Sequence, residues 1–358
     1  MKRYEALDAL RGVAALTVVV FHLGQVKLEP NLFPHGYLAV DFFFVLSGFV
    51  VAHAYEAALR DTLTWRAFAV KRLIRLYPLA LLGGLAGAAV LLLKWRFFPE
   101  KVDPLSTILA SSVLNSLLLP NVFGGIASKG ELFPGNGPLW SLFFEMLINL
   151  LWAAIGVRLR TTYLALFALA SGAALIALAD HQGTLNIGFD AATFMGGVAR
   201  VCFSFPVGVI IYRLHFAGRL PEISFGAALL SLLLVVIFAQ SLFSSRLPLW
   251  DLLSVLVLFP LIVVAGINHV DGNSRIGSFL GELSYPLYVL HFPVLLVFAG
   301  LRQSALSSVN VHLLSVVAVV AAITISWTAF CYYDRPLRRR LADLASKAFS
   351  RRASALSV

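Results

Sequence analysis

The feature of this sequence that most constrains its fold is a series of long apolar stretches separated by short polar segments. A helix needs about 20 mostly apolar residues to cross the hydrocarbon core of a bilayer. The stretches that approach this length are residues 12–28, 38–56, 76–93, 138–157, 162–179, 191–212, 223–241, 250–267, 282–300 and 311–332. The sequence therefore predicts an all-α polytopic membrane protein with about ten transmembrane helices.

The composition excludes several other classes of protein. Only 13% of the residues are charged and 59% are hydrophobic, whereas a soluble domain carries roughly 25% charged residues. The two cysteines, Cys202 and Cys331, both lie inside apolar stretches, which argues against a disulfide scaffold. The net charge of +10 comes largely from basic clusters between the apolar stretches, where it is a topology signal. We therefore expect the lipid bilayer as a partner and no nucleic acid.

Basic residues also predict how the chain is oriented. They cluster within residues 2–11, 60–75, 158–160, 213–219 and 335–340, with Arg275 between the last two clusters. A shorter segment, Leu105–Leu119, is apolar but rich in serine. If this segment does not cross the membrane, every basic cluster lies on one side, which must be the cytoplasm. We therefore predict that Leu105–Leu119 is a short re-entrant or interfacial helix and that both termini are cytoplasmic.

This topology suggests two regions and one external loop. Residues 1–335 would form an integral membrane domain, and residues 336–358 would form a basic cytoplasmic tail. The loop Pro120–Pro138, which contains Lys129 and Glu131, would lie on the outer side. It could contact a substrate there, or it could be a plain connector.

Five ionisable side chains stand out within the predicted spans, where such groups are costly and are functional candidates. They are His22, Asp41, His53, Glu145 and His291. A rise of about 1.5 Å per residue places both His22 and His291 close to the middle of the membrane. Histidine can accept and return a proton at neutral pH, so this placement favours acid–base chemistry.

Each of these groups also has a simpler interpretation. An intramembrane histidine can be a packing residue that donates a hydrogen bond across to a neighbouring helix. We favour that interpretation for His53, which lies near a predicted cytoplasmic helix end. A metal site built from His22, His291, Asp41 and Glu145 is conceivable, but no ligand spacing supports it. We therefore expect no metal.

Arg72 and Arg75 are three residues apart and would share one face of a helix at the start of a span. Two guanidinium groups in this arrangement can clamp a phosphate or pyrophosphate. Basic residues that flank a span also set topology and contact anionic lipid, and charge alone favours this second interpretation. We apply it to the run Arg335–Arg340 as well.

Five short motifs follow one another in the same chain. They are Arg11 with His22 eleven positions later, which follow an opening Arg3–Ala15; Ser47-Gly48-Phe49; Arg72 with Arg75 and Tyr77-Pro78; Trp140-Ser141-Leu142-Phe143-Phe144-Glu145; and Ser284-Tyr285-Pro286-Leu287-Tyr288-Val289-Leu290-His291. In this order the motifs resemble those of the acyltransferase-3 family, membrane acyltransferases that include bacterial polysaccharide O-acetyltransferases. Their combination across residues 3–291 is more specific than any one of them.

The resemblance implies transfer of an acyl group, usually acetyl, from a cytoplasmic acyl-CoA to a hydroxyl of a cell-surface or exported carbohydrate. It also implies a bacterial cytoplasmic membrane, acyl-CoA as the donor substrate and no bound cofactor. The catalytic residues would be His22, as base or acyl relay, with Glu145 and His291; the donor-binding residues would be Arg11, Arg72 and Arg75. The supporting residues would be Asp8, Asp41, Ser47, Trp140, Ser141, Ser284 and Tyr288.

The residues themselves leave two questions open. His22 and Glu145 could share the deprotonation of the hydroxyl, whereas Asp8 more plausibly positions Arg11. Ser47 could form an acyl intermediate, although a Ser-Gly pair inside a span usually allows close helix packing. The alternative function is a transporter or flippase for a glycan or lipid-linked sugar, with the same polar residues lining its pathway.

Overall fold

The computed structural model describes residues 4–121, 130–240, 247–269 and 275–356, and within these ranges the chain is helical. An isolated bridge between Glu131 and Asp190 is the only β pairing in the described ranges. The helices are α1 (Glu5–Gln25), α2 (Ala39–Asp61), α3 (Trp65–Phe97), α4 (Leu105–Ser116), α5 (Leu139–Ala154), α6 (Thr161–Gln182), α7 (Phe194–Phe216), α8 (Ala227–Ala239), α9 (Leu247–Leu253), α10 (Phe259–Asn268), α11 (Arg275–Gln303), α12 (Val311–Ala329) and α13 (Arg335–Leu356). The predicted all-α fold is confirmed.

The described residues contain 8 helices that are long and apolar enough to cross a membrane. Two further predicted spans, residues 138–157 and 223–241, form the shorter helices α5 and α8, of 16 and 13 residues. The helix α5 ends at Ala154, before a 3₁₀ turn at Gly156–Arg158, and α8 begins only after Gly226, so these two helices are shorter than their apolar stretches. The prediction of a multi-pass membrane protein is confirmed, with two of the ten expected spans shorter than predicted.

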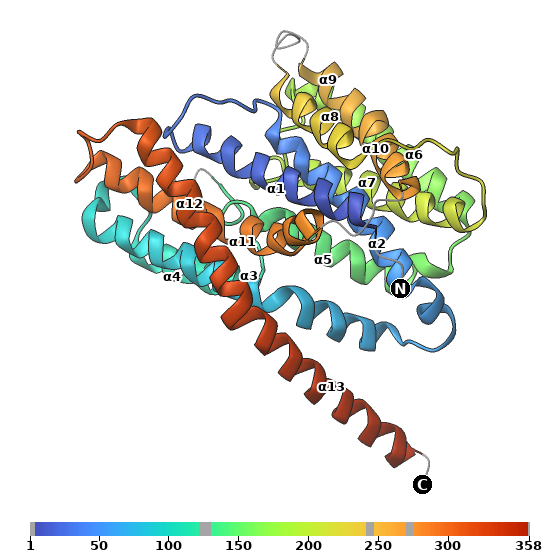
Figure 1. Ribbon diagram of the computed structural model, residues 1–358. Coiled ribbons are helices and arrows are strands. Elements are labelled where there is room, and N and C mark those ends of the chain that lie inside the picture. The colour runs from blue at the N-terminus through green and yellow to red at the C-terminus, as the bar shows by residue number, and fades with distance from the viewer. Residues whose placement is uncertain (1–3, 122–129, 241–246, 270–274, 357–358) are drawn as a thin grey trace.

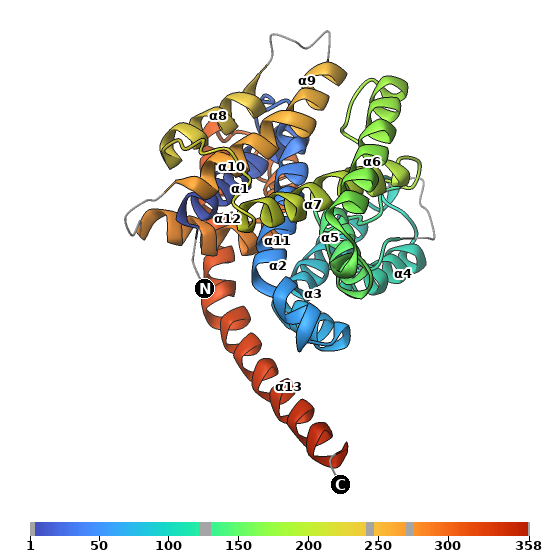
Figure 2. The same ribbon diagram turned by 90° about the vertical axis from the view of Figure 1, so that its right-hand side faces the viewer.

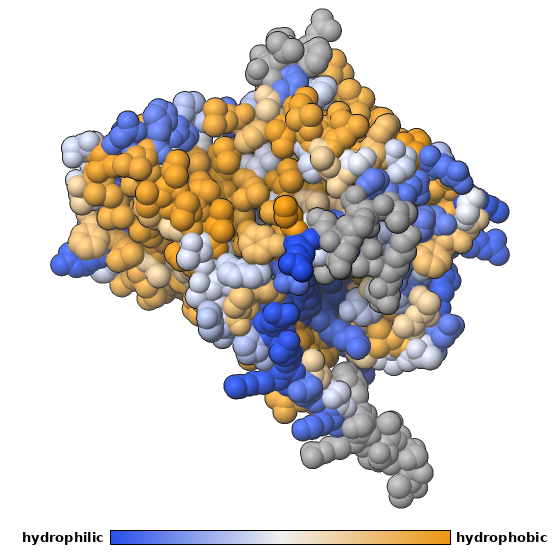
Figure 3. Space-filling view, in the orientation of Figure 1, coloured by the Kyte–Doolittle hydropathy of each residue, from blue (hydrophilic) through white to orange (hydrophobic). Residues whose placement is uncertain are grey.

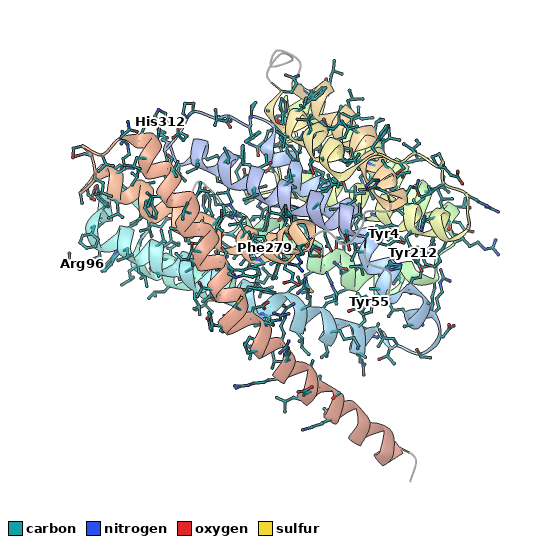
Figure 4. The ribbon with its side chains drawn as sticks, in the orientation of Figure 1. Tyr4, Tyr55, Arg96, Tyr212, Phe279 and His312 are labelled. Atoms are coloured by element: carbon teal, nitrogen blue, oxygen red, sulfur yellow. The ribbon has the colours of Figure 1, made fainter. Side chains whose placement is uncertain are left out.

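The shape of the molecule fits a membrane. Figure 4 places Arg96 and His312 at one end of the helical bundle and Tyr55 and Tyr212 at the other. Hydrophobic side chains cover much of the visible surface between these two ends, whereas hydrophilic side chains gather at the ends (Figure 3). Beyond α12, a π-helical turn, η6 (Phe330–Asp334), leads into α13, which extends away from the bundle (Figures 1 and 2).

The segment Leu105–Leu119 enters the bundle and turns back. Its helix α4 ends against the middle of α3, where a Cβ added to Gly84 would lie 2.9 Å from Cα of Ser116. The chain then reverses at Leu118, which has a positive φ of 57°. The amide of Asn115 donates to the carbonyl oxygens of Leu119 and Leu132 and closes the turn. Because α4 stops about halfway along α3, its course fits the re-entrant form, one of the two predicted forms.

A proline inside α11 leaves one backbone carbonyl oxygen of the helix to be satisfied from outside. Proline has no N–H, so Pro293 leaves the carbonyl oxygen of Val289 without its partner within the helix. The side-chain amide of Asn136 donates to this oxygen at 3.0 Å and to the carbonyl oxygen of Gly83 on α3 at 2.9 Å. Asn136 therefore ties the loop before α5 to two helices next to the candidate site.

Glycines bring α2 and α7 into direct backbone contact. A Cβ added to Gly48 would overlap the carbonyl oxygen of Phe205, and one added to Gly208 would overlap that of Val45. Small residues at a helix crossing allow such close approach in membranes. The expected role of the Ser47-Gly48 pair in helix packing therefore fits the structure at Gly48.

The variant Gly48→Ala is expected to lower the free energy of unfolding by about 1–3 kcal/mol, because α2 and α7 must separate to admit the methyl group. Thermal unfolding of the purified protein in detergent measures the effect. The control is Gly300→Ala on α11, where a Cβ meets nothing within 4 Å. An unchanged melting temperature for Gly48→Ala would show that the helices absorb the methyl group.

Candidate active site

Two histidines meet near the centre of the molecule. Nε2 of His291 lies 3.0 Å from Nδ1 of His22. His291 is fully buried close to the middle of the 29-residue helix α11, whereas α1 ends one turn after His22. The two helices pack closely, since a Cβ added to Gly12 of α1 would overlap Leu280 of α11. The structure thus brings together two predicted catalytic residues that are 269 positions apart.

Backbone carbonyls fix the proton positions of this pair. Nδ1 of His22 lies 2.8 Å from the carbonyl oxygen of Val18, and Nδ1 of His291 lies 2.8 Å from that of Leu287. A carbonyl oxygen only accepts, so each Nδ1 carries the proton in the neutral ring. Nε2 of His291 can then share the single Nδ1–H of His22 with the Val18 carbonyl oxygen. This arrangement leaves the lone pair of His22 on Nε2.

His22 lines a cavity of about 690 Å³, which we call the histidine cavity. Loop residues and helix ends surround it, including Gln25, Tyr37, Glu131 and Gln303. Lys94 and Lys101 also line it, so the cavity lies towards the end of the bundle where Figure 4 shows Arg96. Part of the loop Pro120–Pro138 contributes through Glu131, whereas Lys129 lies outside the described residues.

A second cavity, of about 400 Å³, contains the three predicted donor-binding arginines. We call it the arginine cavity. Its lining includes Arg11, Arg72, Arg75, Ser47, Glu145, Ser284 and Tyr285, with an apolar wall from α2 that includes Phe43 and Phe44. Tyr4 also lines it, and Figure 4 shows this residue towards the end that carries Tyr55 and Tyr212.

Arg11 is held by three partners at the edge of the arginine cavity. Nε donates to Oγ of Ser284 at 2.8 Å, and Nη2 donates to the carbonyl oxygen of Gly281 at 2.6 Å. Oδ1 of Asp8 lies 3.3 Å from the same Nη2. The expected role of Asp8 in positioning Arg11 fits this geometry.

Glu145 belongs to the arginine cavity and not to the histidine pair. Its Oε1 accepts from Oγ of Ser47 at 2.7 Å and from Nη2 of Arg72 at 3.3 Å. The Arg72 side chain is only 11% exposed, so this ion pair is largely shielded from solvent. Glu145 and His22 therefore line different cavities. The geometry gives no support to shared deprotonation by these two residues.

Tyr288 and Val40 line both cavities and so lie between them. The Tyr288 hydroxyl is 2.6 Å from Oγ of Ser141 and donates to the carbonyl oxygen of Pro138 at 3.3 Å. Tyr288 precedes His291 by one helical turn on α11. A reactant that enters the arginine cavity is therefore separated from the histidine pair by little more than this tyrosine.

Asp41 and Trp140 belong to a buried group beside the histidine cavity. Asp41 forms an ion pair with Arg200 of α7 at 2.6 Å, and both side chains are fully buried. The Arg200 guanidinium also lies over the Trp140 ring, 5.2 Å from its centroid. Of the four residues considered for a metal site, only His22 and His291 meet. This leaves Asp41 in a structural ion pair.

The comparison with known families decides what kind of protein this is. The model of the acyltransferase-3 family, described as an acyltransferase domain, matches residues 4–331. The chain belongs to the acyltransferase-3 family. It is therefore an acyltransferase, and its helices make it a membrane acyltransferase.

Several curated proteins are similar to this acyltransferase. "Protein 2 in picA locus" of Rhizobium radiobacter is 40% identical over 166 residues, which cover 44% of this chain and 84% of that protein. The exopolysaccharide production protein ExoZ of Rhizobium meliloti is 27% identical over an alignment that covers 86% of this chain and 91% of ExoZ. A protein provisionally named membrane-bound transacylase BcsY, from Komagataeibacter xylinus, is 26% identical with coverages of 93% and 84%. No solved structure matches the acyltransferase.

Two polar groups of the acyltransferase were missed in the sequence. The first is the side chain of Arg200. The second is a buried set of three residues, in which Asp251 accepts from the Tyr37 hydroxyl at 2.8 Å and lies 2.8 Å from Nδ1 of His35. Asp251 and Arg200 lie in predicted spans, so the same criterion that selected Asp41 could have found them. His35 and Tyr37 lie between α1 and α2, where that criterion does not apply.

His53 has aromatic neighbours in the acyltransferase. Its ring stacks on Phe49 at 6.2 Å and meets the edge of Tyr4 at 5.3 Å. It lines the arginine cavity and not the histidine cavity. This environment fits the packing interpretation.

Proposed function

We propose that this enzyme transfers an acyl group, most often acetyl, from acyl-CoA in the arginine cavity to a hydroxyl of a carbohydrate in the histidine cavity. The observation that carries the proposal is the pair of cavities that meet at Tyr288, one lined by arginines and the other by His22. Arginines suit the phosphates of coenzyme A. The apolar wall of the arginine cavity suits the pantetheine arm that carries the thioester.

His22 is the general base in this proposal. Its Nε2 lone pair accepts the proton of the attacking hydroxyl while the oxygen bonds to the thioester carbonyl carbon. The proton then passes to the departing sulfur, so that coenzyme A leaves as the thiol. Nε2 of His291 and the Val18 carbonyl oxygen share the Nδ1–H of His22, which orients the base.

Tyr288 is the donor best placed for the developing oxyanion. Its hydroxyl lies where the two cavities meet and has the side chain of Ser141 as an alternative partner. A rotation of this O–H towards the thioester oxygen would stabilise the negative charge that forms during attack. Glu145 would then hold Arg72 on the donor side.

We infer the sidedness from charge. Arg60 and Arg213 both pair with Glu56, which follows Tyr55 in the sequence, and Figure 4 shows Tyr55 at the end of the bundle towards which Tyr4 of the arginine cavity lies. The positive-inside rule assigns that end to the cytoplasm, where acyl-CoA is available. The histidine cavity would then face the outer side of a bacterial cytoplasmic membrane, with both termini cytoplasmic.

The test combines glycan analysis with an assay of purified enzyme. Deletion of the gene should remove one acyl group from the mass of a surface or exported carbohydrate. Purified enzyme should release the coenzyme A thiol from acetyl-CoA only when a saccharide acceptor is supplied. A carbohydrate that loses its surface location without any change in mass would instead favour the transporter.

A further inference from the structure

A third cavity continues from the arginine cavity at the start of the C-terminal helix. Its volume is about 340 Å³, within the range of small-molecule sites. Asp8, Arg11 and Arg75 line both cavities, so the two are adjacent. The remaining lining residues are Glu282, Phe330, Arg335 and Arg338. We call this space the four-arginine cavity.

The charge of the four-arginine cavity favours an anion. Its lining has four guanidinium groups against the carboxylates of Asp8 and Glu282. Arginine remains charged at every physiological pH and binds phosphate with a planar, two-pronged set of donors. A ligand that carries several phosphate charges would therefore relieve the repulsion among these groups.

The two arginines of α13 are positioned by the turn that begins the helix. Both guanidinium groups lie near the Phe330 ring, with Arg335 at 5.9 Å and Arg338 at 5.7 Å from its centroid. Nε of Arg338 also lies 2.9 Å from Oδ2 of the buried Asp334. These contacts orient both guanidinium groups at the junction of η6 and α13. Hydrophilic side chains gather there in Figure 3.

We propose that Arg335 and Arg338 complete a binding site for the phosphate groups of the donor nucleotide. This inference rests on the proposed function, in which the thioester arm occupies the adjoining arginine cavity. Coenzyme A carries a pyrophosphate and a 3′-phosphate at the end opposite to its thiol. The phosphates bind in the four-arginine cavity while the arm extends past Arg11 and Arg75 towards Tyr288.

The same helix provides a matched control. Arg339 and Arg340 belong to the same basic run but are exposed and do not line the cavity. The interpretation of the whole run as a topology signal therefore separates into two parts. Arg339 and Arg340 remain topology signals, whereas Arg335 and Arg338 also bind the phosphate groups of the ligand.

The experiment measures binding of adenosine 3′,5′-bisphosphate, the phosphate-bearing nucleotide without the thioester arm, to purified full-length enzyme by calorimetry. Loss of two charge-assisted contacts in Arg335→Ala/Arg338→Ala should raise the Kd at least about tenfold. Arg339→Ala/Arg340→Ala should change it less than about twofold, because neither residue lines the cavity and their charges act on the nucleotide only through salt-screened solvent. The single variant Arg335→Ala, which leaves the pair of Arg338 with Asp334 intact, should show part of the effect.

Turnover separates this proposal from the proposed function. The double variant should raise the KM for acetyl-CoA but not for acetyl-pantetheine, which has no phosphate. Equal effects on both donors, equal effects of the two variant pairs, or no nucleotide binding by the wild type would each overturn the phosphate site. Nucleotide binding that depends on Arg335 and Arg338, without acyl transfer by the wild type, would instead overturn the proposed function alone.

Discussion

Replacement of His22 by alanine is expected to lower kcat for acyl transfer by about 10²–10⁴-fold, the usual contribution of a general base. The reason is that Nε2 of His22 holds the lone pair, since both Nδ1 atoms of the histidine pair donate to backbone carbonyls. Coenzyme A release by the purified variant, with saturating acetyl-CoA and acceptor, measures the effect. The KM for acetyl-CoA should change little, because the donor arginines lie in the other cavity.

Two comparisons make this prediction specific. His291→Ala should lower kcat less than His22→Ala, because it removes the partner of the base and not the base itself. His312→Ala should leave kcat unchanged, because this side chain is 72% exposed and pairs with Glu29 at the surface. Added imidazole should restore part of the activity of His22→Ala. Full activity of a purified, folded His22→Ala enzyme would exclude this residue as the base.

The sequence predicts the helices well because span length and apolar character are local properties. The apolar stretches were enough to predict an all-α membrane protein, and the segment Leu105–Leu119 forms only a 12-residue helix. The same information does not determine helix length near Gly156, where α5 gives way to a 3₁₀ turn, or at Gly226, after which α8 begins. Local turns therefore limit the accuracy of the span count.

The candidate site was predictable only in part, because position along a helix does not determine which neighbour a side chain faces. Glu145 and His22 both lie within predicted spans, yet the two residues line different cavities. The contact between His22 and His291 likewise depends on the close packing of α1 and α11. The motifs named these residues, and only the tertiary structure paired them.

The buried ion pair of Arg200, which we expect to matter for stability, was likewise not predictable from the sequence. Its sequence neighbours on α7 are apolar, and its partner Asp41 lies on α2, 159 positions away. Besides the ion pair, Arg200 donates to the carbonyl oxygens of Ile187 and Tyr37 at 2.9 and 2.8 Å. One buried guanidinium therefore joins two helices and two loops at the edge of the histidine cavity.

The variant Arg200→Met is expected to lower the free energy of unfolding by about 3–5 kcal/mol, because it leaves the Asp41 carboxylate buried and unpaired. Thermal unfolding in detergent and the yield of monodisperse protein both measure the loss. The control is Arg60→Ala, which removes a pair with Glu56 in which the arginine is 42% exposed. Arg60→Ala should lower the free energy of unfolding by about 0–1 kcal/mol, as is typical of exposed ion pairs.

A double variant distinguishes the cost of an unpaired charge from a cost of altered packing. Arg200→Met combined with Asp41→Leu removes both charges, so it should be more stable than Arg200→Met alone. If the double variant is no more stable than the single one, the hydrogen bonds to Ile187 and Tyr37 carry the effect. If Arg200→Met melts at the same temperature as Arg60→Ala, the buried pair contributes no more than an exposed one. The geometry around Asp41, fully buried against a single guanidinium, argues for the large effect.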